Sequence, residues 1–504
     1  MGGQSDFANI SRRQFLTTSA AAASVPLLAG AAEARSNDST QAAPGAFRLV
    51  REIPVESGYD LLVAGGGPAG VAAAVSAARS GAKVLLVEAA GCLGGMGTSG
   101  LVCSFDPMGN GKENLVRGLM LEIVEEMFRR GFVPYKHKSD QLAGFHLWTH
   151  FNPEGYKVVL DEFIQKAGVE VRLFTKLIDA DTDTAARTVR GVVVHDIEGY
   201  RYLGARMFVD ATGDAVLAEL AGAECRRAGQ HTPHIMPPTL TSIYCGVHDG
   251  PIGRGCLGAS VYAQGVKEGA FSQPDYYLQG LSRQSEELAY LNAMHLFGVD
   301  PLRAADRTRA MIEGRRRTQE IVKYFRKHLK GCETMEVAAT GALLGVRESR
   351  RIVGEYELTH QDLHDRREFP DTIGVYCKFV DIHLYEPPKS GAATTGDAGK
   401  TMTVQPKPGE HFSIPYSVLV PRGWKNLWAA GRCLSADVVA HGSARCQPYC
   451  SMMGQAAGTA AAQCLRTGQT ACDLDTEALI LALRQAGAYL PQSKLSKRMT
   501  RNRA

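Results

Sequence analysis

A glycine-rich turn between a buried strand and a helix constrains this chain more than any other feature of its sequence. Residues 59–64 (Tyr-Asp-Leu-Leu-Val-Ala) are mostly apolar without alternation, which is typical of a buried parallel strand. The sequence Gly65-Gly66-Gly67-Pro68-Ala69-Gly70 follows, and the Ala-rich residues 71–80 then favour a helix. Residues 83–88 predict a second strand that ends in an acid. This order is typical of a dinucleotide-binding βαβ unit.

The turn and the acid have separate expected roles in that unit. Gly65 allows the tight turn, Gly67 lets the backbone approach a pyrophosphate, and Gly70 lets helix and strand pack closely. The helix N-terminus then faces the phosphates. Glu88 is expected to accept hydrogen bonds from the adenosine ribose hydroxyls. Because a carboxylate disfavours a 2′-phosphate, we do not expect NADP here.

A second glycine-rich loop favours FAD over NAD as the ligand. Residues 91–100 contain five glycines in place of the helix and strand that would follow in a simple dehydrogenase. Such a loop lets the backbone lie against an extended ligand that reaches toward a second ring system. Residues 206–214 and 426–432 each predict a strand that runs into a small-residue turn of the same site.

An Ala-rich helix is predicted from Met453 onward. If its N-terminus points at the flavin pyrimidine ring, its dipole would stabilise an anionic reduced flavin. Tight packing in the core explains the same composition, and the two interpretations are compatible.

Together these segments resemble the FAD-dependent oxidoreductase family whose members are often labelled "xanthan lyase", and residues 151–162 and 345–351 also match its pattern. The resemblance covers most of residues 59–465, although nothing in the chain looks like a polysaccharide lyase. It implies an α/β fold: a Rossmann-like, glutathione-reductase-type FAD-binding domain with an inserted α+β substrate or cap domain. The expected FAD contacts are Gly65, Gly67, Pro68, Ala69, Gly70, Glu88, Ala89, Gly94, Gly95, Met96, Thr98, Leu177, Ala211, Thr212, Gly213, Asp214, Gly431, Arg432, Gly454 and Gln455.

The expected domain organisation is discontinuous. A signal peptide (1–34) and a linker (35–56) precede an FAD-binding domain built from residues 57–105, 150–225 and 405–470. Residues 106–149 and 226–404 form the substrate or cap region, and residues 471–504 form a C-terminal helix and a basic tail. Three strands at 169–174, 191–195 and 206–209 have the hairpin-like spacing of a small inserted sheet.

The N-terminus resembles a twin-arginine signal. Arg12 and Arg13 precede a weakly hydrophobic run, and Ala32-Glu33-Ala34 supplies small residues for a signal peptidase. An ordinary secretory signal is the alternative. Because the twin-arginine route carries folded proteins, it suits a chain that acquires its cofactor in the cytoplasm. We expect a periplasmic or otherwise extracytoplasmic protein without a transmembrane anchor.

Composition argues against two other classes of site. The net charge is +4, and no basic stripe interleaved with aromatics suggests a nucleic-acid partner. The 12 cysteines include no Cys-x-x-Cys pair, so we expect no metal site. The arginine-rich residues 303–330 predict a helix that either meets a membrane surface or anionic partner, or presents a solvated face.

Four residues are candidates for the chemistry. Arg347 is placed to clamp a carboxylate or stabilise an enolate, or else forms a salt bridge with a neighbouring glutamate. His411 precedes a short strand leading back to the flavin domain, and His441 lies between the turn at Gly431 and the Ala-rich helix. We prefer His441 as the catalytic base, with Arg445 as its anion partner, although a lone histidine is more often structural. Redox-active roles for Cys92 and Cys103 compete with buried packing.

These features predict an exported FAD-dependent dehydrogenase or reductase that exchanges hydride between a small organic substrate and flavin N5. The chain has no second nucleotide fingerprint, so a quinone, a cytochrome or oxygen fits better than NAD(P)H as the electron partner. One alternative is a flavin-dependent lyase or isomerase without net redox change. Another is a non-catalytic flavin electron carrier, which would lack a cavity beneath a cap.

Overall fold

The computed structural model describes residues 47–133, 148–250, 252, 257–273, 280–292, 294–387 and 404–491. Residues up to Glu52 form one unit, and residues 53–504 form a second compact unit, to which the following description refers. The predicted signal peptide and the basic tail lie outside the described residues, and the boundaries between the FAD-binding and cap regions stay a prediction. In the part of the chain described, no helix combines the length and apolarity that a membrane crossing requires.

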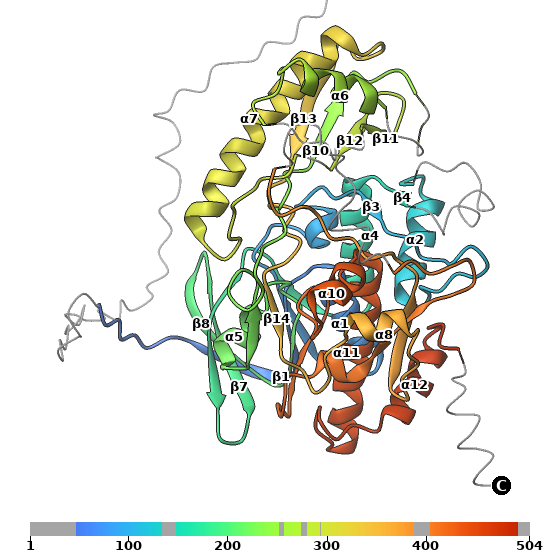
Figure 1. Cartoon of the computed structure of the whole chain (residues 1–504). Helices are drawn as coiled ribbons and strands as arrows, with labels where there is room; N and C mark the ends of the chain where they lie inside the picture. Colours follow the sequence, from blue (N-terminus) through green and yellow to red (C-terminus); the bar gives the residue numbers. More distant parts are fainter. Residues whose placement is uncertain are drawn as a thin grey trace, which may run out of the picture. The chain divides into compact units, whose positions relative to one another are not determined.

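The central sheet has seven strands among the described residues, in the order β5-β2-β1-β8-β7-β6, with β17 also beside β8 (Figure 1). Strands β5, β2, β1, β8 and β17 run parallel, whereas β6, β7 and β8 pair antiparallel. The strands are β1 (Val55–Ala64), β2 (Val84–Val87), β5 (Glu170–Arg172), β6 (Lys176–Asp183), β7 (Thr188–Asp196), β8 (Gly199–Asp210) and β17 (Leu427–Ala429). The mixed α/β class with a parallel sheet is therefore confirmed.

The hairpin differs from the sequence prediction in one strand. Residues 169–174 contribute β5, which pairs parallel with β2 at the sheet edge and takes no part in the hairpin. The hairpin consists of β6 and β7 and continues into the first half of β8. Strand β6 was missed because Asp179, Asp181 and Asp183 are poor strand formers in a segment of eight residues.

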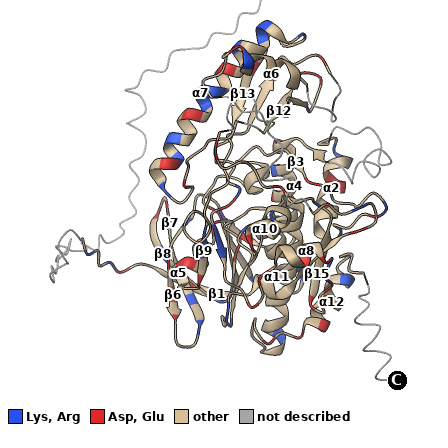
Figure 2. Cartoon of the chain, in the orientation of Figure 1, with Lys and Arg blue, Asp and Glu red and all other residues tan. Residues whose placement is uncertain are grey.

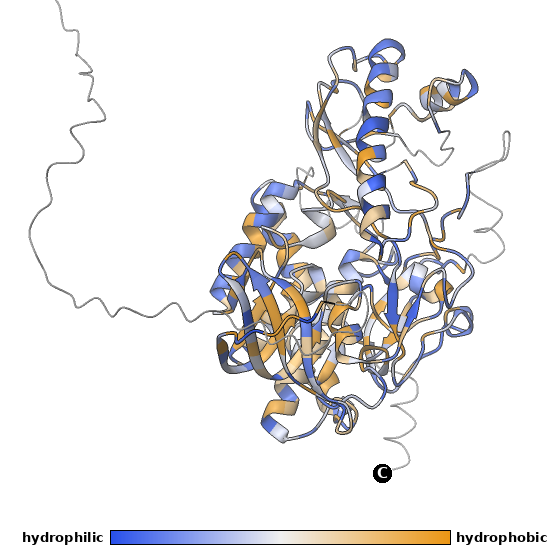
Figure 3. Cartoon of the chain, turned by 90° about the vertical axis from the view of Figure 1, so that its left-hand side faces the viewer, coloured by the Kyte–Doolittle hydropathy of each residue, from blue (hydrophilic) through white to orange (hydrophobic). Residues whose placement is uncertain are grey.

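The two faces of the parallel sheet bury alternate residues of β1. Leu61 and Val63 point into a core shared with helices α1 (Pro68–Arg79) and α11 (Gln447–Thr467). Leu62 and Ala64 point into a second core shared with α5 (Val216–Ala221). This alternation follows from the two-residue period of a strand, and burial on both faces explains the apolar run in the sequence. Figure 3 shows this apolar interior in orange.

A second, antiparallel sheet forms a separate layer with two helices (Figure 1). Its strands, in the order β11-β12-β10-β13, are β11 (Ser282–Arg283), β12 (Ala289–Leu291), β10 (Ser242–Cys245) and β13 (Glu336–Thr340). Helices α6 (Ala259–Lys267) and α7 (Ala304–His328) share its apolar core. Basic and acidic residues alternate along α7 (Figure 2), and Arg316 pairs with Glu313 and Glu320.

Further helices and short strands surround these two sheets. They are η2 (Gly95–Gly97), β3 (Ser104–Phe105), α2 (Leu119–Arg129), β4 (Thr149–His150), α4 (Pro153–Lys166), β9 (Cys225–Arg227), β14 (Arg350–Ile352), α8 (His360–His364), β15 (Thr372–Tyr376), β16 (Phe412–Pro415), η3 (Tyr416–Leu419), α10 (Val438–Ala444) and α12 (Thr476–Gln485). Three antiparallel pairs, β3–β4, β9–β14 and β15–β16, join segments that are far apart in the sequence.

Candidate functional site

A cavity of about 1180 Å³ lies at the carboxyl ends of the parallel strands. Ala64 and Val87 end β1 and β2, and Ala211 and Ala430 directly follow β8 and β17; all four line it. This is the edge at which open α/β sheets bind their ligands. Other lining residues come from α7, β12 and the segments around residues 343–347 and 378–383. The cavity therefore extends from the glycine turn to the second sheet.

The glycine turn has the geometry that the sequence predicted. Gly65 has a φ of +100°, and a Cβ on it would lie 2.6 Å from the carbonyl oxygen of Ala211, so a side chain is excluded there. A Cβ on Gly70 would lie 1.7 Å from the carbonyl oxygen of Gly65. Gly70 therefore serves helix–strand packing and does not line the cavity, whereas Gly65, Gly67, Pro68 and Ala69 do.

The start of α1 fits a phosphate group. The helix begins at Pro68, and its N-cap residue Gly67 provides no side-chain cap. No atom lies within 4 Å of the position that a Cβ on Gly67 would occupy, and Gly67 lines the cavity. Because the first N–H groups of a helix lack intrahelical partners, this end of α1 leaves donors and open space for a pyrophosphate.

Glu88 is held in a fixed orientation at the wall of the cavity. Its Oε2 accepts a hydrogen bond of 2.6 Å from the backbone N–H of Gly66, and its Oε1 accepts one of 2.7 Å from Ala90. Each carboxylate oxygen retains a second lone pair for a ligand hydroxyl. Ala89 and Leu177 line the same part of the cavity, as predicted for the adenosine end. The residues present therefore fit FAD at this end.

The second glycine loop contributes in two ways. Gly95 and Met96 line the cavity. Gly94 and Thr98 do not line it but brace the loop, since the Gly94 N–H donates to the carbonyl of Gly66 and the Thr98 hydroxyl donates to that of Leu93.

Helix α11 begins earlier than the sequence prediction, which was wrong by almost two turns. It starts at Gln447, so Cys446, Gln447 and Cys450 at its N-terminus line the cavity. Gly454 instead packs against α1, where a Cβ would lie 2.0 Å from the carbonyl oxygen of Ala69. The Gln455 side chain accepts from the backbone N–H of Leu119 at 3.1 Å, at the start of α2. Neither residue reaches the cavity.

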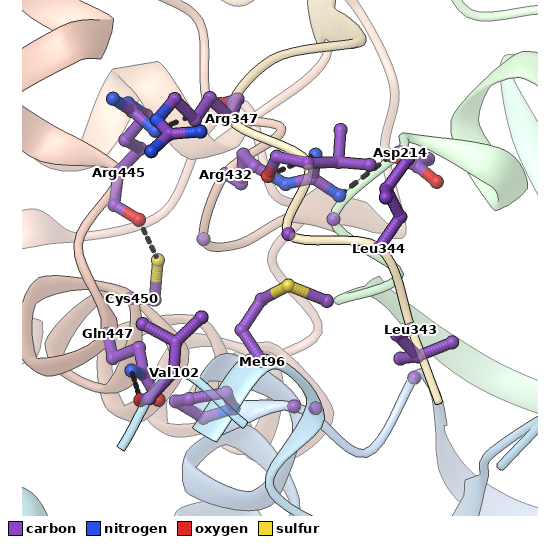
Figure 4. A pocket seen from close by; sticks show the side chains of 18 of the residues that line it. Met96, Val102, Asp214, Leu343, Leu344, Arg347, Arg432, Arg445, Gln447 and Cys450 are labelled. Atoms are coloured by element: carbon purple, nitrogen blue, oxygen red, sulfur yellow. Dashed lines mark hydrogen bonds and ion pairs between the residues drawn. The ribbon is translucent and has the colours of Figure 1, made fainter. Parts of the chain in front are cut away.

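Asp214 is the centre of an ion-pair network at the cavity wall (Figure 4). It lines the cavity with Thr212 and Gly213, and its Oδ1 accepts from Ser349 at 2.6 Å and from Arg432 at 2.7 Å. Its Oδ2 pairs with Arg307 of α7 at 2.6 Å. Burial alone would raise the pKa of Asp214, but Arg432 and Arg307 outweigh it and lower that pKa below its ordinary value. The network ties the turn after β8 to α7.

Arg347 and Arg445 lie next to each other at the cavity (Figure 4). Arg347 is buried and donates to the carbonyl of Pro237 at 2.8 Å, while Glu348 pairs with Arg351. Arg445 donates to the carbonyl of Asp381 at 3.0 Å, and its buried Nε has no hydrogen-bond partner. The structure therefore brings these two guanidinium groups together at the cavity, and their roles stay a prediction. Gly431 and Arg432 also line this region.

The two predicted histidines do not line the cavity. His441 is fully buried, and its Nε2 lies 2.9 Å from the carbonyl oxygen of Arg432. Burial and the neighbouring Arg351 and Arg445 hold the pKa of His441 well below its ordinary value. His411 precedes β16 away from the cavity, and burial lowers its pKa as well. Cys92 and Cys103 also lie outside the cavity lining.

A polar group next to Arg445 was not predicted from the sequence. Lys378 pairs with Asp106 at 2.9 Å and lies 3.9 Å from Asp381, and the His383 ring lies 3.3 Å from Asp381. Burial would lower the pKa of Lys378, but the two carboxylates raise it. Burial and then Arg347 lower the pKa of His383 to about 3. Residues 378–383 (Lys-Phe-Val-Asp-Ile-His) match no catalytic or binding motif, so the sequence carries no signal for this group.

Ser104 and His150 were not predicted from the sequence either. They lie on β3 and β4 and line the cavity together with Trp148. Burial lowers the pKa of His150 to about 4. Strands β3 and β4 are short and show no apolar alternation, so the sequence carries no signal for Ser104 and His150.

The chain matches one family model and resembles several solved structures at low identity. The model of the family described as FAD dependent oxidoreductase matches residues 60–483. No curated protein matches the chain. Among solved structures, a geranylgeranyl bacteriochlorophyll reductase-like protein from Thermoplasma acidophilum is 14% identical, with 86% of this chain and 83% of that chain covered and a TM-score of 0.43. The p-nitrophenol 4-monooxygenase of Pseudomonas putida is 12% identical (86% and 82% covered, TM-score 0.42). The L-proline dehydrogenase of P. horikoshii is 13% identical (87% and 100% covered, TM-score 0.39).

Proposed function

Because the chain belongs to the FAD dependent oxidoreductase family, and is therefore an FAD-dependent enzyme, we propose that it is an exported dehydrogenase or reductase of small organic anions. One observation carries the proposal. A single cavity joins the glycine turn and Glu88 to a region that contains Arg347, Arg445 and Lys378. Its volume of about 1180 Å³ exceeds the roughly 300–1,000 Å³ of most ligand pockets, which leaves room for a substrate beside the cofactor.

The residues of the chain have distinct tasks in this proposal. The first turn of α1 and Glu88 would hold the pyrophosphate and ribose of FAD, which would supply a two-electron acceptor for the reaction. Arg347 and Arg445 bind the negative group of the substrate, since paired guanidinium groups match a carboxylate in shape and charge. Arg432 donates hydrogen bonds to Asp214 and to the carbonyl of Val346. It thereby fixes the turn after β8 relative to the segment that carries Arg347.

The cavity also bears on the alternatives. Its lining includes Met311 of α7 and Tyr290 of β12, which lie in the predicted cap region. A non-catalytic electron carrier has no need of such an enclosed site, so we favour an enzyme with its own substrate. For the second electron partner we keep a quinone, a cytochrome or oxygen, because the chain has one nucleotide fingerprint and no second one that would indicate an NAD(P)H site.

Anaerobic titration of the holoprotein tests the proposed reaction. We expect at least one member of a panel of small hydroxy, amino and unsaturated carboxylates to bleach oxidised FAD, or to reoxidise the chemically reduced enzyme. NADH serves as the matched control and should do neither. Turnover of a carboxylate to product with the flavin spectrum unchanged would support the lyase or isomerase instead.

Export is the second part of the proposal, and it depends on Arg12 and Arg13. We expect the double variant Arg12→Lys/Arg13→Lys to retain the FAD-loaded protein in the cytoplasm of a bacterium with a twin-arginine pathway. Arg35→Lys, beyond the predicted cleavage site, should be exported normally. Undiminished export of the double variant would contradict the twin-arginine route and favour an ordinary secretory signal.

A further inference from the structure

Two polar residues face each other across a short ladder at the cavity wall. Strands β3 and β4 pair antiparallel with Ser104 opposite His150 and Phe105 opposite Thr149. Side chains at directly opposed positions lie on the same face, with Cβ atoms about 4.5–5.5 Å apart. Ser104 and His150 both line the cavity, whereas Phe105 stacks on Phe151 in the core at 4.1 Å. The ladder therefore turns its Ser–His face toward the cavity.

Both side chains carry a buried atom without a partner. Ser104 Oγ and His150 Nδ1 make no hydrogen bond, although Ser104 is only 5% exposed. Of the buried side-chain atoms without partners in the described residues, only Arg445 Nε and Gln447 Oε1 also belong to residues of this cavity. Leaving buried polar atoms unpaired is costly, so their concentration in one cavity points to a polar ligand that completes them.

The surroundings keep His150 neutral. Burial lowers its pKa to about 4, so the imidazole carries no charge at neutral pH. Lys378 and Asp106, which also line the cavity, pair with each other at 2.9 Å, and Lys378 lies over the Trp148 ring. The Tyr290 ring lies 5.7 Å from that of His150. A neutral imidazole next to a hydroxyl can accept a proton, and Ser104 can orient the group that gives it.

We propose that Ser104 and His150 bind the hydroxyl group on the carbon that is oxidised, and that the substrates are hydroxy carboxylates. This rests on the proposed function, in which Arg347 and Arg445 of the same cavity bind the carboxylate. The hydroxyl O–H bond breaks and its proton goes to His150 Nδ1. The adjacent C–H bond breaks, its electron pair leaves with the hydrogen for oxidised FAD, and a C=O bond forms. The substrate loses two electrons and the cofactor gains them.

Matched pairs of carboxylates that differ by one hydroxyl test the assignment in the holoprotein. The pairs are lactate with propionate, malate with succinate, and mandelate with phenylacetate. Binding is measured from the perturbation of the flavin absorbance and, independently, by calorimetry. We expect the wild type to bind the hydroxylated member of one pair at least tenfold more tightly. His150→Gln and Ser104→Ala should lose that preference while their affinity for the member without a hydroxyl stays within threefold.

Rapid-reaction measurements of flavin reduction then separate the two residues. Removing a positioned general base costs about 10²–10⁴-fold in rate, so His150→Gln should slow reduction by at least a hundredfold. Ser104→Ala, which keeps the base, should slow it about tenfold. His195→Gln, at an exposed histidine of β7, is the matched control and should match the wild type. FAD content and melting temperature show whether each variant has folded. If His150→Gln has not folded, Ser104→Ala alone provides the binding test.

The possible failures are distinguishable. Should no carboxylate of any class reduce the wild-type flavin or oxidise its reduced form, the proposed function itself is wrong. Should a carboxylate without a hydroxyl react as fast as its hydroxylated partner, the reaction survives and the assignment of Ser104 and His150 fails. An unchanged hydroxyl preference in both variants would overturn the assignment as well.

Discussion

Glu88 accepts hydrogen bonds from two backbone N–H groups at the cavity wall, so removal of its charge tests its predicted role in FAD binding. In Glu88→Gln, the amide group would have to face either Gly66 or Ala90, both of which are donors. A hydrogen bond to a charged group contributes about 1.5–3 kcal/mol, so we expect FAD affinity to fall roughly 10- to 100-fold. Equilibrium dialysis measures it. Glu122→Gln, at an exposed ion pair with Arg79, is the control. If the two variants bind FAD with equal affinity, Glu88 does not contact the ribose.

Asp214 should matter more for folding than its single charge suggests. Asp214→Asn leaves Arg432, which is 13% exposed, and Arg307, which is 40% exposed, without their carboxylate. Breaking a fully buried pair costs about 3–5 kcal/mol, and the partial exposure of Arg307 reduces this to roughly 2–3 kcal/mol. Urea unfolding measures the change. Asp365→Asn at an exposed site should change the free energy of unfolding by less than about 0.5 kcal/mol.

The contrast between Glu88 and His150 explains which site residues the sequence could predict. Glu88 belongs to a local pattern in which turn, helix and strand follow within thirty positions, so its place is encoded nearby. His150 reaches the cavity only because β4 pairs with β3, some 45 positions earlier in the chain. Such pairing depends on tertiary packing, and a single histidine carries no signal of it. The position of His441 between the Gly431 turn and the Ala-rich helix predicts a catalytic base, but its side chain is buried in the core.

At the scale of elements, the contact between α1 and α11 should be the least tolerant of added volume. A Cβ on Gly454 or Gly458 would lie 2.0 Å from the carbonyl oxygen of Ala69 or Ala73, and backbone atoms cannot move aside as side chains do. Overpacking costs about 1–3 kcal/mol, so we expect Gly454→Ala to lower the melting temperature by several degrees. Because α1 also presents Gly67 to the phosphates, FAD affinity should fall too.

Arg466→Ala, on the exposed last turn of the same helix, is the matched control for Gly454→Ala. It should leave both the melting temperature and the FAD affinity unchanged within error. If Gly454→Ala behaves like this control, the helices have room to separate, and the glycines of α11 serve some purpose other than close packing.

The start of α11 differs from the prediction because its first turns have a modest helix propensity. Tyr449, Cys450 and Ser451 favour a helix less than the alanines that follow Gly454 do. Pro448 in the first turn is a signal for a helix start, since proline is favoured at that position. In the structure the cost in propensity is offset by the packing that Gly454 and Gly458 permit against α1. Tertiary contact, which no local pattern records, decided the boundary.

For the whole molecule, the second sheet was beyond sequence prediction for a similar reason. Strand β10 pairs with β12 and β13, which follow it by about 45 and 95 positions, and each has five residues or fewer. The consequence is functional as well as topological. The sequence predicts that the arginine-rich helix faces a partner or the solvent. In the structure its first half lines the cavity through Arg307, Thr308, Met311 and Arg315. Arg317 is buried and donates to the carbonyl of His295. The helix serves both the cavity and the core.

Three histidines with lowered pKa values, of which His383 and His441 are buried and His150 is half-buried, should make the stability of the whole molecule depend on pH. Burial lowers the pKa of His150 to about 4 and that of His383 to about 3, and it holds the pKa of His441 well below its ordinary value. In the unfolded chain all three would titrate near pH 6.5. Below that pH the three histidines bind protons in the unfolded chain but stay neutral in the folded chain. The free energy of unfolding therefore falls as the pH falls. The effect persists until the folded pKa values are reached.

The expected slope follows from proton counting. Each histidine contributes up to about 1.4 kcal/mol per pH unit, so three contribute about 4 kcal/mol per unit near pH 5. Asp210, whose pKa burial raises, acts in the opposite direction and offsets part of this loss. Urea unfolding of the holoprotein at pH 7.5, 6.0 and 5.0 measures the slope. His383→Gln should reduce the slope by the contribution of about one proton, whereas His195→Gln, at an exposed site, should leave the slope unchanged. If the free energy of unfolding does not change between pH 6.5 and 5, the three histidine rings are protonated in the folded protein.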